Sequence, residues 1–177
     1  MGLGQRADEI FDVVNEFDEV VGREKRGEVH RLGLRHRAVH VLVFNSRGEV
    51  FLQKRSMKKD TFPGVWDSSS SGHLDSGEDY DSCAVRELWE EIGLKLDNAP
   101  ARLFKISACL ETGEEFVWVY HCEAEGPFNL HPDEIEEGRW FAPQAVNRWL
   151  AERPQDFARA FLLIWSKAAP TLAKGAE

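Results

Sequence analysis

The sequence predicts an α/β fold built on a mixed sheet, and three observations support this class. Short apolar segments typical of strands alternate along the chain with segments whose apolar residues repeat at the helical period. The chain has 177 residues, 42% of them hydrophobic, which allows a sizeable core within the usual size of one domain. No apolar run approaches the length of a membrane span. We therefore expect residues 1–177 to form a single domain, with an N-terminal hairpin extension and C-terminal helices.

Two hairpins are expected in the first third of the chain. Residues 10–15 and 19–23 should pair around the turn sequence NEFD, and residues 38–45 and 50–55 should pair across SRGE. The run AVHVLVF in the third of these segments is rich in β-branched residues. This composition suits a buried central strand.

The second half of the chain predicts three more strands and two closing helices. The strands are expected at residues 103–110, 115–122 and 138–141, and the helices at residues 143–151 and 155–167. Pro143 falls in the first turn of the first closing helix, where proline is tolerated. The second closing helix presents one apolar face, made of Phe157, Phe161, Ile164 and Trp165.

Between these two groups of segments, residues 79–92 predict an amphipathic helix. Ser76 and Asp79 fit a capping box that opens it, and Gly93 is placed to close it in a left-handed conformation. At 3.6 residues per turn, one stripe faces the core and a neighbouring stripe collects carboxylates. The core stripe is Ala84, Val85, Leu88 and Ile92, and the acidic stripe is Glu87, Glu90 and Glu91.

The acidic stripe indicates a cation site. Each like-charged pair three or four residues apart costs a helix roughly 0.2 to 0.5 kcal/mol, and a bound cation would remove that cost. Carboxylate oxygens suit Mg²⁺ or Mn²⁺, and Mg²⁺ in proteins usually keeps waters and substrate phosphates among its ligands. The small, polar segment WDSSSSGHLDSG leads directly into the helix and allows a phosphate or metal to approach the backbone. The alternative is an acidic helix face that contacts only water.

Charge and cysteine content narrow the possible partners and compartment. The net charge of −9 argues against binding a nucleic-acid polymer through a basic patch, so a polyanionic substrate would need a metal and local Lys or Arg side chains. Cys83, Cys109 and Cys122 have neither metal-ligand spacing nor an even count for disulfides, and we expect buried thiols. With no signal-peptide or lipidation pattern at the N-terminus, a cytoplasmic protein without membrane association is expected. No feature of the sequence indicates an oligomeric state.

The segment GHLDSGEDYDSCAVRELWEEIGL resembles the Nudix box, Gly-x5-Glu-x7-Arg-Glu-aliphatic-x-Glu-Glu-x-Gly-aliphatic. Every specified position is filled, by Gly72, Glu78, Arg86, Glu87, Leu88, Glu90, Glu91, Gly93 and Leu94. The resemblance implies a Nudix-type α/β/α sandwich, in which a mixed curved sheet carries the box helix on one side and a C-terminal helix on the other. It also implies a hydrolase that uses Mg²⁺ or Mn²⁺ to split the diphosphate linkage of a nucleoside diphosphate joined to another group.

The resemblance also suggests roles for residues of the box. Glu87, Glu90 and Glu91 would bind the metal, with the Gly72 carbonyl as a further ligand, and Arg86 would orient the carboxylates. Glu78 would form a structural salt bridge or act directly in catalysis.

Outside the box, the resemblance leaves two functions open. The general base would be a box glutamate or a later acid, for which the chain offers Asp133, Glu134, Glu136 and Glu137. Lys54 and Arg55 are candidate phosphate contacts, or simply alternating exposed strand residues.

A second resemblance concerns the stretch from His36 to His73, which is similar to the isopentenyl-diphosphate isomerase branch of the same superfamily. The cysteine that such isomerases place before the Gly-His pair is replaced here by Ser71, whose hydroxyl is too weakly acidic for the proton transfer. Glu115 matches a glutamate that opens a strand in the isomerases. His30 and His36 match a histidine pair, although one residue closer together, and His73 matches a ligand of a second metal. We assign none of the histidines as a ligand and favour hydrolysis over isomerisation.

A third hypothesis is a catalytically silent module that binds a nucleotide. The intact box argues against it, because a pure binder has no need of clustered carboxylates and their electrostatic cost. No motif distinguishes ADP-ribose, dinucleoside polyphosphates, NADH or coenzyme A as the substrate. Trp66, Trp118 and Phe128 could stack on a base, but aromatic residues in or beside strands are more often core.

Overall fold

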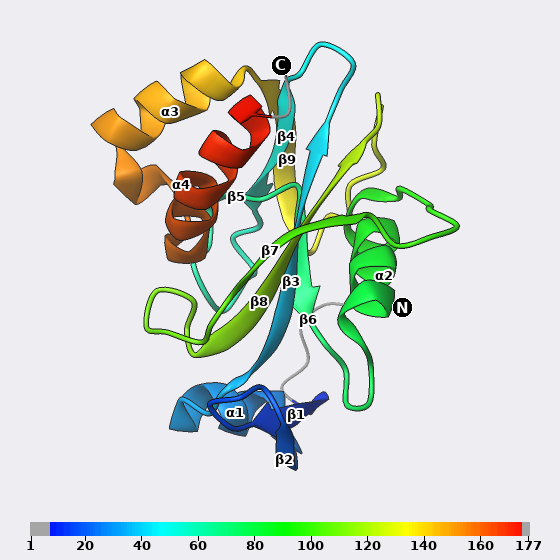
Figure 1. Cartoon of the computed structure of the whole chain (residues 1–177), viewed down its shortest axis with the longest axis vertical. Helices are drawn as coiled ribbons and strands as arrows, with labels where there is room; N and C mark the ends of the chain where they lie inside the picture. Colours follow the sequence, from blue (N-terminus) through cyan, green and yellow to red (C-terminus); the bar gives the residue numbers. More distant parts are fainter. Residues whose placement is uncertain (1–7, 175–177) are drawn as a thin grey trace.

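The computed structural model describes residues 8–174, which form a small N-terminal sheet, a larger sheet and flanking helices (Figure 1). The small sheet consists of β1 (Ile10–Val14) and β2 (Val20–Lys25), followed by α1 (Arg26–Leu32). The larger sheet contains β3 (His36–Phe44), β4 (Val50–Arg55), β5 (Trp66–Asp67), β6 (Ser70–His73), β7 (Ala101–Ile106), β8 (Glu115–Glu123) and β9 (Ile135–Phe141). The helices are α2 (Tyr80–Ile92), α3 (Pro143–Glu152) and α4 (Arg159–Lys174), with a 3₁₀ turn at Pro154–Asp156.

The larger sheet is mixed, as the sequence predicts. Its seven strands follow the order β5-β4-β3-β8-β7, while β6 pairs with β3 and β9 pairs with β4. Strands β3 and β8 run parallel along their full length, and the other pairs are antiparallel. Parallel strands are usually buried on both faces, and the apolar residues of β3 up to Val43 are indeed buried.

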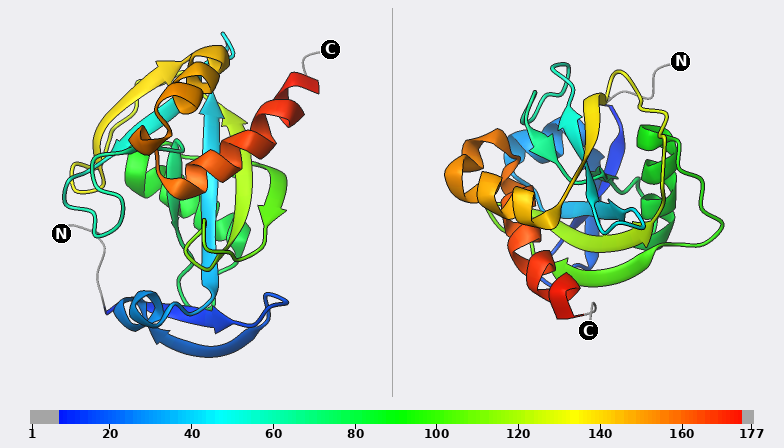
Figure 2. Two further views of the ribbon diagram at one scale, coloured as in Figure 1. Left: turned by 90° about the vertical axis from the view of Figure 1, so that its left-hand side faces the viewer. Right: turned by 90° about the horizontal axis from the view of Figure 1, so that it is seen from above.

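Helices cover the two faces of this sheet, and alternation along β3 assigns its side chains to one face or the other. Ala38 and Leu42 belong to the core cluster that also contains Phe161, Ile164 and Trp165 of α4. Val39 and Val41 belong to the cluster that contains the apolar stripe of α2. The box helix and the C-terminal helices therefore lie on opposite faces, which confirms the expected sandwich (Figures 1 and 2).

The start of α2 differs from the prediction. The N-cap is Asp79, whose carboxylate accepts a hydrogen bond from the Ser82 amide, and Ser76 takes no part in capping. Instead, the Ser76 hydroxyl and the Gly77 amide donate to the Asp12 carboxylate, at 2.7 and 2.9 Å. Ser76 thus connects the N-terminal hairpin to the loop before the box helix. The end of α2 is as predicted, since Gly93 is left-handed with φ of 69°.

Other elements depart from the predicted ones in ways that local sequence does not reveal. Helix α1 was not predicted. Strands β5 and β6 were not predicted either, because segments of two and four residues are too short to show a strand pattern. Helix α4 begins at Arg159 instead of residue 155, since Phe157 is extended and bridges to Trp66. Strand β7 ends at Ile106, four residues early.

Two smaller expectations can also be compared with the structure. Cys83 is buried, as expected, whereas Cys109 and Cys122 are only partly buried. Trp66 and Phe128 pack in or against the two core clusters. Within residues 8–174, no helix has the length and apolar character needed to cross a membrane.

Candidate functional site

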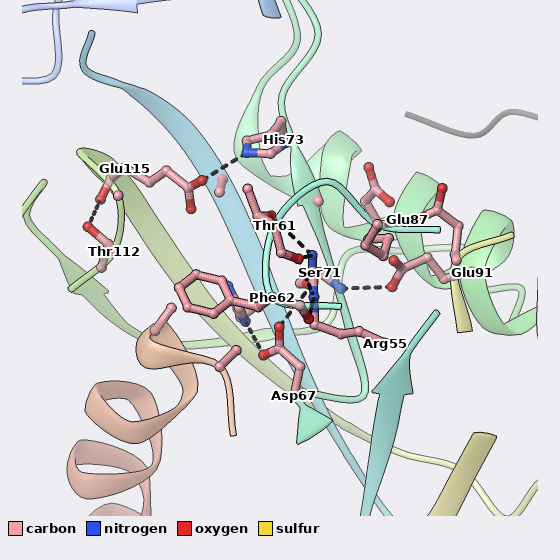
Figure 3. Close-up of a pocket in the computed structure, with 18 of the residues that line it drawn as sticks. Arg55, Thr61, Phe62, Asp67, Ser71, His73, Glu87, Glu91, Thr112 and Glu115 are labelled. Atoms are coloured by element: carbon pink, nitrogen blue, oxygen red, sulfur yellow. Dashed lines mark hydrogen bonds and ion pairs between the residues drawn. The ribbon is translucent and has the colours of Figure 1, made fainter. Parts of the chain in front are cut away.

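A pocket with a volume of about 520 Å³ lies where the loops around the larger sheet converge (Figure 3). This volume is within the usual range for ligand sites, about 300 to 1,000 Å³. The box residues Gly72, Arg86, Glu87, Glu90 and Glu91 all line it. Residues from α1, β3, the β7–β8 loop and the start of α4 complete the wall.

The short strand β6 divides the pocket into two sides. Ser71 pairs with His40 and His73 pairs with Ala38, so these four side chains share the face of β3 that is turned toward α4. Gly72 has the opposite orientation and faces α2. A Cβ atom at Gly72 would lie 2.0 Å from Cδ of Glu87. The absence of a side chain at Gly72 therefore lets the Glu87 carboxylate lie directly against the strand.

Arg86 organises the box carboxylates. Its Nη1 donates to Glu87 at 2.7 Å and to Glu90 at 3.1 Å, while Nε and Nη2 donate to Glu78 at 2.9 and 2.8 Å. Nη2 also donates to the carbonyl of His73 at 3.0 Å, which ties the helix to β6. Glu78 thus forms the salt bridge that the sequence suggested as its structural role.

Glu91 is fixed by neutral donors and lies deeper than the other box acids. Its Oε2 accepts hydrogen bonds from the Ser71 amide at 2.9 Å and from Nε2 of Gln53 at 3.0 Å. Burial raises the pKa of the Glu91 carboxyl, against the lowering effect of Lys59. Burial also raises the pKa of Glu87, against the effect of Arg86 and with a further increase from Glu91 and Glu90.

The raised pKa values of Glu87 and Glu91 indicate that groups of the protein do not fully compensate the negative charges of these carboxylates when they are ionised. Glu87 and Glu91 are 9% and 3% exposed, so water cannot supply the missing compensation. A divalent cation would provide the missing positive charge, and the donor set is the oxygen-rich one that Mg²⁺ and Mn²⁺ prefer. The residues present therefore fit such an ion.

The predicted residues outside the box have different surroundings. Lys54 bonds Glu136 at 3.2 Å and does not line the pocket. Arg55 does line it, but its guanidinium donates to Asp67 at 3.2 Å and to the carbonyls of Thr61 and Phe62. Arg55 therefore holds a loop in place as well as bordering the pocket.

Of the four later acids, Glu134 alone lines the pocket, and it pairs with the buried Lys59. Asp133 pairs with Lys58, and Glu137 pairs with Arg139. Glu134 is thus the later acid that borders the same pocket as the box carboxylates.

A second group of potential ligands lies on the α4 side of β6. One ligand atom from each of four residues lies within 4.8 Å of the others, and these residues are His30, His36, His73 and Glu115. These residues come from α1, β3, β6 and β8. They are spread over 86 positions of the sequence, from His30 to Glu115, and the fold brings them together. We call this group the histidine cluster.

The hydrogen bonds of the histidine cluster suit a metal. Nδ1 of His36 lies 2.9 Å from the Leu34 carbonyl, a contact in which Nδ1 donates and in which a neutral ring would keep its lone pair on Nε2. That Nε2 is buried and has no hydrogen-bond partner among the described residues, and it lies 3.4 Å from Glu115. Nε2 of His73 lies 2.8 Å from the same carboxylate. A buried nitrogen lone pair that has no hydrogen-bond partner and lies near other ligand atoms is suited to bind a cation.

The electrostatics of the histidine cluster agree with this interpretation. Burial, followed by His73 and His36, lowers the pKa of His30 to about 4. Burial also lowers the pKa of His73. Although burial alone would raise it, His73 and His36 bring the pKa of Glu115 well below its usual range. A neutral His30 or His73 and an ionised Glu115 are in the protonation states in which these side chains bind a metal.

These four residues are far apart in the sequence, which does not by itself predict any of them as a ligand. Histidines that flank or enter a strand are more often core or surface residues than ligands, and the shorter spacing of His30 and His36 departs from the isomerase pattern. In the structure, the turn of α1 at Gly33, with φ of 64°, brings the two rings to a centroid distance of 5.1 Å.

Comparison with known proteins agrees with the box and with the fold. The model of the NUDIX domain matches residues 34–161. The chain belongs to the Nudix hydrolase family. It is 38% identical over 149 residues to an uncharacterized Nudix hydrolase of Streptomyces coelicolor, covering 81% of this chain and 80% of that protein. It is 30% identical over 162 residues to the uncharacterized Nudix hydrolase YfcD of Escherichia coli K12, covering 90% and 87% of the two chains.

Comparison with solved structures also supports the Nudix fold. The crystal structure of DR0079 from Deinococcus radiodurans has a TM-score of 0.74 and 32% sequence identity, and the match covers 82% of this chain and 90% of that one. Nudix hydrolases act on pyrophosphate bonds and use divalent metals, so the enzyme class predicted from the box is confirmed.

Proposed function

We propose that this Nudix hydrolase is a Mg²⁺- or Mn²⁺-dependent pyrophosphohydrolase that cleaves the diphosphate linkage of a nucleoside diphosphate joined to another group. The observation that carries the proposal is the pair of buried carboxylates, Glu87 and Glu91, whose pKa values are raised by burial. Arg86 and Lys59 compensate their negative charge only in part, and a cation bound beside them would supply the rest. The net charge of −9 adds a reason for a metal, because a polyanionic substrate is otherwise repelled.

The side chains of the box have different roles in the proposed hydrolysis. A divalent ion held by Glu87, Glu90, Glu91 and the Gly72 carbonyl would neutralise charge that develops on the phosphate oxygens. Arg86 holds two of these carboxylates in position.

Two groups beside the ion site act on the phosphate and the water. Lys59 is buried next to Glu91 and Glu134 and adds positive charge for a phosphate oxygen. Glu134, the later acid that lines the pocket, is our candidate to accept the proton of the attacking water, with a box glutamate as the alternative.

We also propose that the histidine cluster holds a second ion. Three imidazoles and one carboxylate suit a transition metal such as Zn²⁺ better than Mg²⁺. Zinc titration followed by equilibrium dialysis should show a bound ion that is lost in His36→Ala and retained in His121→Ala, a histidine outside the pocket. Equal zinc binding by the two variants would contradict this second site.

The isomerase alternative retains one observation in its favour, since the histidine cluster includes the residues that resemble the isomerase metal site. Ser71 argues against it, because its hydroxyl cannot serve as a thiol acid at the working pH. A silent binding module is disfavoured by the cost of burying Glu87 and Glu91 without catalytic use.

A substrate panel with metal controls tests the proposed function. The panel contains ADP-ribose, dinucleoside polyphosphates, NADH, coenzyme A and isopentenyl diphosphate, each with Mg²⁺, with Mn²⁺ and with EDTA. We expect hydrolysis of at least one nucleotide in the presence of either ion, and its loss in EDTA. Formation of dimethylallyl diphosphate at a comparable rate would favour the isomerase, and no turnover of any compound would favour the binding module.

A further inference from the structure

His40 is a buried histidine that the metal chemistry of the box does not use. It lies in β3, is 5% exposed, and lines the pocket on the side turned toward α4. The residues that pair or alternate with it on that side are Ala38 and Ser71. A polar side chain buried in a core strand destabilises the protein unless its nitrogens have hydrogen-bond partners.

One nitrogen of His40 is fixed by the protein. Nδ1 lies 2.9 Å from the Ser68 hydroxyl and 3.7 Å from the Asp67 carboxylate. Asp67 is held in turn by Arg55, at 3.2 Å, and by the Ser68 amide, at 2.8 Å. An adjacent carboxylate favours the proton on Nδ1, and burial lowers the pKa of His40, which keeps the ring neutral.

The other nitrogen of His40 is therefore an acceptor directed to the pocket. Within the described residues Nε2 makes no hydrogen bond, and it is not among the buried polar atoms that lack a partner. Because His40 lines the pocket and Nδ1 faces Ser68, Nε2 is the polar atom that His40 offers to a ligand.

An aromatic ring borders the same side of the pocket. Phe62 is 45% exposed, and its backbone has φ of 47°, an unusual conformation for a bulky residue. Arg55 fixes this conformation by donating to the carbonyls of Thr61 and Phe62, at 2.9 and 3.1 Å. Figure 3 shows the ring directed toward Thr112 and away from Glu87 and Glu91. The surrounding contacts thus present an apolar, planar surface to the pocket instead of burying it.

We propose that Ala38, His40, Phe62 and Ser71 form a subsite for the part of the substrate beyond the diphosphate, in which Nε2 of His40 accepts a hydrogen bond from a hydroxyl or amino group. We call these four residues the His40 subsite. The inference rests on the proposed function, because it assumes that the diphosphate lies at the box carboxylates across β6. Phe62 covers the planar or apolar portion of the same group, and Asp67 and Ser68 position the imidazole.

Substrate analogues that each lack one donor test the hydrogen bond. The best nucleotide of the panel is compared with its 2′-deoxy analogue and with the analogue whose base amino group is replaced by a keto group. The wild type should discriminate against one of them by about 3- to 10-fold in kcat/KM, the range expected for a single hydrogen bond. In His40→Leu this discrimination should disappear, with the change in KM and not in kcat, because binding and not chemistry is affected.

Two further variants separate positioning from general damage. Ser68→Ala frees the imidazole and should weaken the same discrimination, whereas His121→Leu, outside the pocket, should leave it unchanged. ¹⁵N NMR of the imidazole gives a measurement that needs no turnover. The wild type should show the Nδ1-protonated tautomer, with an Nε2 resonance that shifts when the nucleotide is added in EDTA.

The outcomes distinguish this inference from the proposed function. Normal hydrolysis with unchanged discrimination in His40→Leu, or an Nε2 resonance that does not respond to the nucleotide, would overturn the subsite alone. If the wild type hydrolyses no diphosphate, the proposed function fails and the subsite fails with it.

Discussion

Replacing Glu91 by glutamine should lower kcat by on the order of a hundredfold or more with little loss of folding. An amide cannot supply the negative charge that holds the divalent ion, and that ion stabilises charge present mainly in the transition state. The glutamine oxygen can still accept the bonds from Ser71 and Gln53, so the local geometry is preserved. Steady-state kinetics at saturating Mg²⁺ on the best substrate of the panel measure the effect.

The stability of the same variant gives an independent check with a defined pH dependence. Because the pKa of Glu91 is raised by burial, ionised Glu91 destabilises the metal-free protein above that pKa. In EDTA near pH 7, Glu91→Gln should therefore melt at or above the wild-type temperature. The advantage should shrink as the pH falls through the folded pKa, where Glu91 of the wild type becomes protonated.

Mg²⁺ should reverse this order of stability. An ion at tenfold its dissociation constant adds about 1.4 kcal/mol to the wild type, or roughly 3 to 6 °C in melting temperature for a chain of this size. The increment should be smaller in Glu91→Gln and unchanged in Glu125→Gln, which lies outside the pocket. Wild-type kcat and a wild-type Mg²⁺ increment in Glu91→Gln would show that Glu91 does not hold the divalent ion.

The parts of the fold that the sequence predicted correctly are those with a regular hydrophobic period. The segment AVHVLVF belongs to central β3, and the box helix ends at Ile92 as predicted. The pairing partners of Ser76 and the strand character of residues 70–73 depend on contacts with distant residues. Ser76 bonds Asp12, and β6 exists because it pairs with β3. Neither contact leaves a local pattern in the sequence.

The residues of the candidate site also differ in how far the sequence predicts that they lie together. The carboxylates and Arg86 are adjacent on one helix, so helical geometry alone indicates that they share a patch. The histidine cluster depends on how α1 packs over the end of β3, and sequence spacing cannot report such packing. For Lys54 and Arg55 the sequence predicts phosphate contacts from charge alone, and it does not reveal that the structure places Glu136 and Asp67 beside them.

Gly72→Ala should abolish most of the activity through steric displacement of Glu87. The new methyl group would lie 2.0 Å from Cδ and 2.1 Å from Oε1 of Glu87. The Glu87 side chain is buried and bonded to Arg86, so it cannot move away without breaking the arrangement of the ion site. We expect kcat to fall by about a hundredfold, the scale seen when one group at a reacting centre is lost.

Backbone strain does not explain this loss, because Gly72 is not among the glycines with positive φ. Gly22→Ala is the matched control, since Gly22 also lacks a positive φ and has open space around its Cβ position. A double-mutant cycle with Glu87→Ala identifies the cause, because neighbouring residues that act through one contact are not additive. If Gly72→Ala acts by moving Glu87, it should cost little in the Glu87→Ala background. An equal further loss there would place its effect elsewhere in the pocket.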